Sequence, residues 1–154
     1  MAEEIAIRVL VPTILGIGVG LIEAYFVYED ENMGGLQGFF GKVWHGILFS
    51  IIGVLIATNV AYFLSQGWVP SFLEGLLFMD DVGRSFTASL LIALVMFIKI
   101  DLAHRVRGIS GTGFIEKPWH KMAVACLIGF SPYYISAFDP FFAGLQEVIP
   151  WLPL

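Results

Sequence analysis

Four long apolar segments occupy more than half of this 154-residue chain, and they leave few folds open to it. The segments run from about residue 5 to 28, 45 to 66, 82 to 103 and 122 to 142. A helix needs about 20 mostly apolar residues to cross a bilayer, and each segment has that length. Because lipid offers no partner to unpaired backbone groups, we expect all four segments to be transmembrane helices of an all-α integral membrane protein.

The composition supports a membrane protein over a soluble one. Hydrophobic residues make up 58% of the chain and charged residues 14%. In soluble domains roughly half of the residues are hydrophobic and roughly a quarter are charged. A soluble domain of this length could not bury so much apolar surface, so the expected partner is the lipid bilayer. The net charge of −5 and the lack of a basic tract argue against nucleic acid. A single cysteine, Cys126, excludes an internal disulfide.

The pattern Gly-Phe-x-x-Lys-x-Trp-His occurs twice, at 38–45 and 113–120, and each copy leads into an apolar segment. Such a repeat predicts two copies of one structural unit, here about 5–76 and 82–154, within a single transmembrane domain. Each unit holds two spans, so both copies have the same orientation and form a 2+2 parallel internal repeat. We also expect short interfacial helices after the second and fourth spans.

Positively charged residues set the predicted orientation of the four spans. Loops 29–44 and 104–121 fall on one side of the membrane, and the chain termini fall on the other. Lysine and arginine favour the cytoplasmic side. Arg8 and Arg84 are the basic residues of the terminal side, whereas the loop side has five. We therefore expect both loops in the cytoplasm and both termini outside. The five basic residues of the loop side are Lys42, Arg105, Arg107, Lys117 and Lys121.

Three ionisable residues fall inside apolar segments, where a charge is costly and needs an explanation. Glu23 lies in the first segment, and Lys99 and Asp101 lie in the third. An offset of 76 residues aligns Glu23 with Lys99 in the two repeats. One interpretation is a proton or cation site on a pathway between the repeats. The other is a structural Glu23–Lys99 ion pair, or side chains that reach the headgroups by snorkelling.

The histidines His45, His104 and His120 are all predicted at the inner membrane boundary. Asp101 and His104 are three residues apart and therefore share a helical face. Imidazole and carboxylate at one depth can bind a divalent metal or relay a proton. Histidine beside tryptophan is also an ordinary interfacial anchor. We predict no cofactor, with a divalent metal at His45, His120, Asp101 and His104 as the alternative.

Two further features concern helix packing. Gly16 and Gly20 form a Gly-x-x-x-Gly pattern, which lets another helix approach closely. We favour packing within the chain over a dimer interface. Pro132 interrupts the polar stretch 131–136 of the fourth segment and removes a backbone donor. The resulting kink could line a cavity, or neighbouring hydroxyls could donate hydrogen bonds to the backbone carbonyl that it leaves unpaired.

No catalytic signature occurs in the sequence, which lacks Gly-x-Ser-x-Gly, Cys-x-x-Cys and His-Glu-x-x-His, so an enzyme is not expected. The internal repeat and the intramembrane charges favour a small channel or transporter for a proton, a cation or another small solute. Four helices enclose little space, so we expect a homo-oligomer. The alternative is a non-catalytic structural or accessory subunit of a larger membrane complex, which the short tails and apolar surfaces would fit.

Overall fold

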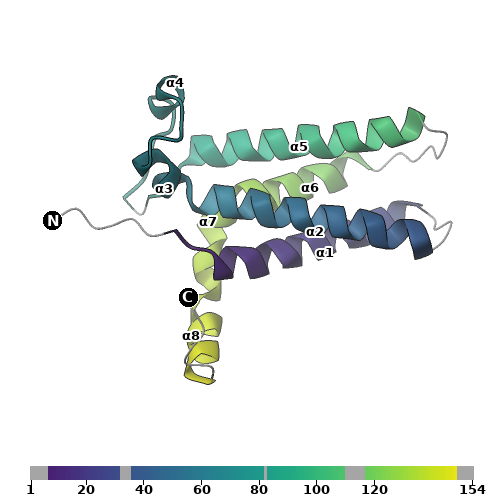
Figure 1. Cartoon of the computed structure of the whole chain (residues 1–154), viewed down its shortest axis with the longest axis horizontal. Helices are drawn as coiled ribbons and strands as arrows, with labels where there is room; N and C mark the ends of the chain where they lie inside the picture. The colour runs from purple at the N-terminus through teal and green to yellow at the C-terminus, as the bar shows by residue number, and fades with distance from the viewer. Residues whose placement is uncertain (1–6, 32–35, 82, 110–116, 149–154) are drawn as a thin grey trace.

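The computed structural model describes residues 7–31, 36–81, 83–109 and 117–148, and it describes their side chains except at 31, 36–42 and 103–109. Every regular element in these ranges is a helix, so the all-α class is confirmed. Four longer helices form a bundle (Figure 1): α1 (Leu10–Glu31), α2 (Leu36–Thr58), α5 (Phe86–Ile109) and α6 (Pro118–Gly129). The shorter elements are α3 (Val60–Ser65), α4 (Ser71–Glu74), α7 (Ser131–Tyr134), η1 (Ile135–Phe138) and α8 (Asp139–Val148).

The longer helices are arranged as two hairpins. α1 packs mainly against α2, and α5 packs mainly against α6. Between the hairpins, α1 contacts α6, while α2 contacts both α5 and α6. The helices α1 and α5 begin at Leu10 and Phe86, which are separated by the offset of 76 residues used to align the repeats. The division into repeats at 5–76 and 82–154 stays a prediction.

All four longer helices contribute to the buried core. Its members are branched aliphatic, small or flexible side chains that fill the space between the helices without adding polar atoms. They are Val19, Val54, Met96, Ile100, Val124, Ala125 and Ile128.

Glycines allow the close approach of α1 and α2. A Cβ atom on Gly16 would lie 2.5 Å from the Cα of Ile51, and one on Gly20 would lie 2.4 Å from the Cα of Ile47. Both separations are well below an ordinary contact between carbon atoms. The Gly-x-x-x-Gly pattern therefore packs within the chain, as the sequence predicted.

The second apolar segment becomes helical earlier than predicted. α2 begins at Leu36, so Trp44 and His45 lie inside a helix rather than at its start. The second Trp-His pair differs in that Trp119 and His120 lie in the first turn of a helix, because α6 begins at Pro118. Proline suits the first helical position, since it lacks the N–H that would be unpaired there, and it forces the preceding residue out of the helical region. Lys117 accordingly has an extended ψ of 129°.

The fourth apolar segment is broken rather than continuous. α6 ends at Gly129, Phe130 leaves the helix, and α7 then begins with Pro132 in its first turn. The chain bends by 63° at this break. The predicted interruption is confirmed, and it falls just before the proline because proline suits the start of the new helix. With 12 residues, α6 is about 18 Å long.

The short helices α4 and α8 lie at the end of the bundle where α1 begins, and they extend to opposite sides of it (Figure 1). α8 covers most of the predicted interfacial stretch after the fourth segment. α4 forms only one turn of the stretch expected after the second. Beyond α4, the Asp80 carboxylate accepts hydrogen bonds from the backbone N–H of Arg84 at 2.7 Å and from its Nε at 2.8 Å. This local pairing stabilises a loop between α4 and α5, where the sequence predicted a longer interfacial helix.

One helix among the described residues is long and apolar enough to cross a membrane, namely Leu10–Asp30. A second would qualify if Pro118–Gly129 and Ser131–Val148 were counted together as one broken span. The stretch Val43–Thr58 is apolar but shorter. By length and composition, the described chain therefore holds one or two candidate membrane spans.

Candidate functional site

Glu23 is a buried carboxylate between α1 and α2, with only 8% of its surface exposed. The hydroxyl of Ser50 on α2 donates a hydrogen bond to its Oε2 at 3.4 Å. Gly46, one turn earlier on α2, leaves room for the carboxylate, because a Cβ there would lie 3.0 Å from the same oxygen. α2 therefore faces Glu23 with the hydroxyl of Ser50 and with the space that Gly46 leaves.

An apolar layer separates Glu23 from the end of the bundle where α1 begins. Val19 lies one turn before Glu23 on α1, and Val54 lies one turn after Ser50 on α2. Both valines are buried members of the core. On that side the carboxylate therefore faces packed aliphatic groups.

Lys99 contacts α2 from α5. Its Nζ lies 3.6 Å from the centroid of the Phe49 ring, and a cation over an aromatic face is attracted by the ring quadrupole. This contact bridges the two hairpins. The Glu23–Lys99 ion pair considered from the sequence stays a prediction.

Asp101 forms an ion pair with Lys121. The Nζ of Lys121 donates a hydrogen bond to Oδ1 of Asp101 at 2.9 Å, and both side chains are mostly buried. The pair joins α5 to α6 within the second hairpin. The side chain of His104 lies outside the described residues, so the predicted Asp101–His104 face stays a prediction.

A second buried carboxylate, Asp30, joins α1 to α6. Its Oδ2 lies 2.5 Å from Nδ1 of His120 and accepts the backbone N–H of Lys117 at 3.1 Å. The Asp30 side chain is 2% exposed and that of His120 is 0% exposed. The Nζ of Lys117 completes the cluster, at 3.2 Å from Oδ1 of Asp30 and 3.4 Å from Oε1 of Glu29. Asp30 thus places a negative charge at the amino terminus of α6, where the helix dipole favours it.

The Asp30 hydrogen bond also raises the pKa of the Lys117 ammonium, and desolvation offsets part of this effect. Lys117 therefore stays positively charged beside the two carboxylates of α1. The cluster ties the two hairpins together at this end of the bundle.

The His120 ring is enclosed by aromatic side chains. It stacks on Phe26 with a centroid distance of 4.1 Å and an interplanar angle of 6°, and Trp119 contacts it edge-on. The Asp30 carboxylate orients the imidazole ring through Nδ1. Nε2 is buried and has no hydrogen-bond partner among the described residues.

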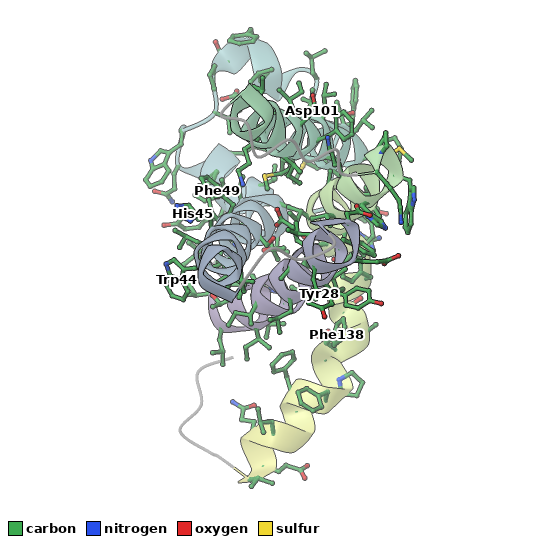
Figure 2. The ribbon with its side chains drawn as sticks, turned by 90° about the vertical axis from the view of Figure 1, so that its right-hand side faces the viewer. Tyr28, Trp44, His45, Phe49, Asp101 and Phe138 are labelled. Carbon is green, nitrogen blue, oxygen red and sulfur yellow. The ribbon has the colours of Figure 1, made fainter. Side chains whose placement is uncertain are left out.

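The histidines of the two Trp-His copies have different surroundings. His45 and Trp44 are exposed on the outer side of α2 (Figure 2), whereas His120 is buried against α1. In the described part of the chain, no group of three or more His, Cys, Asp or Glu side chains is placed to hold a metal ion. The metal site at His45, His104, His120 and Asp101 stays a prediction.

Asp30 and Lys121 were missed as site residues from the sequence. The first span was expected to end at residue 28, which placed Asp30 in a loop, whereas α1 continues to Glu31. The available signal was spacing: Asp30 lies seven residues after Glu23, which puts both on the same helical face. Lys121 was counted only as a charge of the inner loop.

No protein-family model, no curated protein and no solved structure matches the chain.

Proposed function

We propose that this chain is an integral membrane protein that conducts protons by way of Glu23. In this arrangement the two hairpins cross the bilayer four times, with α6, α7 and η1 together forming the fourth crossing. The burial of Glu23 inside a long apolar helix carries the proposal. Ionisable groups in that position typically mark ion or proton pathways.

The dimensions and surface of the bundle support a membrane location. α1, α2 and α5 have 22, 23 and 24 residues. At about 1.5 Å per residue, each matches a hydrocarbon core about 30 Å thick. Apolar side chains are exposed along these helices, and an apolar surface of that extent normally has a partner. The exposed set includes Leu21, Tyr25, Leu48, Leu94 and Val95.

The polar groups of α1 support a route for protons from one end of the bundle. Glu23, Phe26 and Asp30 follow one helical face, and His120 lies against the last two of them. Asp30 and His120 lie at the Lys117 end of this face, and Glu23 lies two turns farther along α1, beyond the Phe26 ring. Beyond Glu23 the valine layer would act as a gate, since apolar constrictions close by excluding water.

A proton is a better cargo than a dehydrated divalent cation. Calcium requires about six to eight oxygen ligands. Among the described residues, no group of three or more His, Cys, Asp or Glu side chains is placed to hold a metal ion, around Glu23 or elsewhere. A carboxylate needs only one oxygen to accept a proton.

Proton flux in proteoliposomes tests this function. Vesicles containing the purified protein and a pH-sensitive dye would be given a potassium diffusion potential with valinomycin. We expect acidification above that of empty vesicles, and we expect Glu23→Gln to reduce it to the background rate. Glu74→Gln is the matched control, because it removes the same charge from an exposed position on α4 and should leave the flux unchanged.

Two outcomes would contradict the proposal in different ways. Unchanged flux in Glu23→Gln would remove this residue from the mechanism. No flux of protons, sodium or potassium through the parent protein would exclude transport and favour the alternative, an accessory subunit of a larger membrane complex.

A further inference from the structure

The buried polar side chains among the described residues form two groups. The inner polar group lies around Glu23 and toward the end of α1, and its members are Glu23, Ser50, His120 and Lys121. The outer polar group lies where α2 ends, α5 begins and α7 follows α6, which is the end of the bundle where α1 begins (Figure 1). Its members are Asn59, Ser85, Ser89 and Ser131. The proposed function uses the inner polar group, and the outer polar group calls for an explanation of its own.

A closely packed apolar layer separates the two groups. Val19 of α1, Val54 of α2 and Ile128 of α6 are buried core residues of this layer. A Cβ atom on Gly53 would lie 2.6 Å from Cγ2 of Ile128, so α2 and α6 meet closely here. Protons that leave Glu23 toward the outer end would therefore have to pass this layer before they reach the outer polar group.

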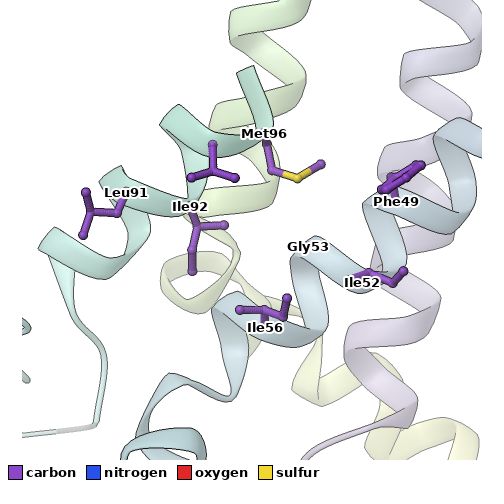
Figure 3. Close-up of a pocket in the computed structure, with 8 residues that line it drawn as sticks. Phe49, Ile52, Gly53, Ile56, Leu91, Ile92 and Met96 are labelled. Atoms are coloured by element: carbon purple, nitrogen blue, oxygen red, sulfur yellow. The ribbon is translucent and has the colours of Figure 1, made fainter. Parts of the chain in front are cut away.

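An apolar groove between α2 and α5 lies beside the layer and gives water no way around it. The groove has a volume of about 220 Å³, and Gly53 and Met96 are among its lining residues (Figure 3). All of its lining residues are apolar. Apolar cavities stay dry, because water finds no hydrogen-bond partner in them. Water is therefore expected at the polar groups and not in the groove.

Ser131 differs from other members of the outer polar group in the state of its hydroxyl. It is 0% exposed, and its Oγ has no hydrogen-bond partner among the described residues. Asn59, by contrast, exchanges two hydrogen bonds with the backbone of Arg8, at 2.7 and 2.8 Å. The Oγ of Ser85 accepts the backbone N–H of Ala88 at 3.2 Å. A buried hydroxyl is costly unless it is hydrogen-bonded, which makes that of Ser131 a ready partner for water.

The break between α6 and α7 places a second polar group near this hydroxyl. Pro132 has no N–H, so it cannot donate to the carbonyl of Ile128, one helical turn earlier. The hydroxyl of Tyr134 donates to the neighbouring carbonyl of Leu127. Ser131 and the Ile128 carbonyl belong to the same turn of the chain, and a buried water molecule needs more than one such partner.

We propose that Ser131 holds an internal water molecule and is a polar residue of the proton route on the outer side of the apolar layer. The inference rests on the proposed function, since it supplies the outer half of the route that begins at the Asp30 end. Each hydroxyl group or water molecule on such a route accepts one proton and releases another, so it is unchanged after the proton has passed. The apolar layer then lies between two polar regions, as in a pore that closes by excluding water.

Hydrogen–deuterium exchange of a cysteine S–H group tests whether water reaches this position. Ser131→Cys nearly keeps the size of the side chain, and its infrared S–H band would be followed in heavy water after Cys126 has been replaced by alanine. Val54→Cys is the matched control, because Val54 is also 0% exposed but lies in the apolar layer. We expect the band of Ser131→Cys to decay about tenfold faster, because exchange requires contact with water.

Proton flux tests whether the same hydroxyl serves conduction. We expect Ser131→Ala to lower the flux about fivefold in the proteoliposome experiment, because it removes a partner that holds the water. Its free energy of unfolding should be unchanged or higher, since the variant removes a buried hydroxyl that bonds no described residue. Ser65→Ala is the matched control, because it makes the same change at an exposed position on α3 and should leave the flux unchanged.

The possible outcomes separate this inference from the proposed function. Equally slow exchange at positions 131 and 54 would overturn the water site, and unchanged flux in Ser131→Ala would overturn its place on the route. Fast exchange at position 131 with no flux through the parent protein would contradict proton conduction and leave the water site in place. Flux that depends on Glu23, together with slow exchange at position 131, would contradict only this inference.

Discussion

Asp30 is the residue at which the two hairpins are most directly joined by charge. Its carboxylate is buried and bonds both His120 and the backbone of Lys117. Asp30→Asn keeps the size of the side chain and removes its charge. We expect a loss of about 1.5–3 kcal/mol in the free energy of unfolding, the usual contribution of a buried hydrogen bond to a charged group. Unfolding in mixed detergent micelles, followed by circular dichroism, would measure it.

Glu29→Gln provides the control for this prediction. Glu29 contacts the same Lys117, but its side chain is 46% exposed, and exposed ion pairs contribute little. We expect a change near zero. An equal effect of Asp30→Asn and Glu29→Gln would show that burial of Asp30 adds nothing to the junction.

At the scale of single residues, some of the site residues could be predicted from the sequence and others could not, for a physical reason. Glu23, Lys99 and Asp101 stood out because a charge inside an apolar segment is costly wherever it faces. Lys121 and Asp30 did not stand out, because each lies at a segment end where charges are common. Their burial depends on a helix from another part of the chain, which no local pattern contains.

At the scale of elements, the crossing of α1 and α2 depends on glycine. Gly20→Ala would place a Cβ 2.4 Å from the Cα of Ile47. We expect a loss of about 1–3 kcal/mol in the free energy of unfolding, as for other overpacked contacts. The same detergent unfolding experiment would measure this loss.

Gly18→Ala is the control that makes the Gly20→Ala prediction specific to the contact between α1 and α2. A Cβ at Gly18 would have no atom within 4 Å, and alanine favours a helix by up to about 1 kcal/mol relative to glycine. We therefore expect a neutral or stabilising effect. A similar destabilisation by both substitutions would contradict the close crossing of α1 and α2.

Helices could be predicted from the sequence more reliably than their boundaries. Long apolar stretches indicated the four helices because burial, in core or lipid, requires paired backbone groups. The early start of α2 was missed because residues 36–44 looked like a loop beside the Trp-His pattern. The break before Pro132 was expected, since proline cannot continue a helical hydrogen-bond ladder.

At the scale of the whole molecule, a repeated sequence has produced two unlike contacts between hairpins. α1 and α6 are joined by the Asp30–His120 pair, whereas α2 and α5 are bridged by Lys99 and flank an apolar groove. The predicted repeats differ at several aligned positions: Glu23 aligns with Lys99, and Pro118 with Val43.

The proposed function depends on the chain crossing the membrane, and the predicted orientation places the Asp30 end in the cytoplasm. Thiol accessibility in intact cells tests that arrangement directly, using single-cysteine variants in which Cys126 is first replaced by alanine. We expect Asp81→Cys, between α4 and α5, to react with an impermeant maleimide added outside. Glu29→Cys, near the end of α1, should react only after permeabilisation. Reaction of both cysteines from the same side, or release of the protein from membranes by alkaline carbonate, would contradict the account.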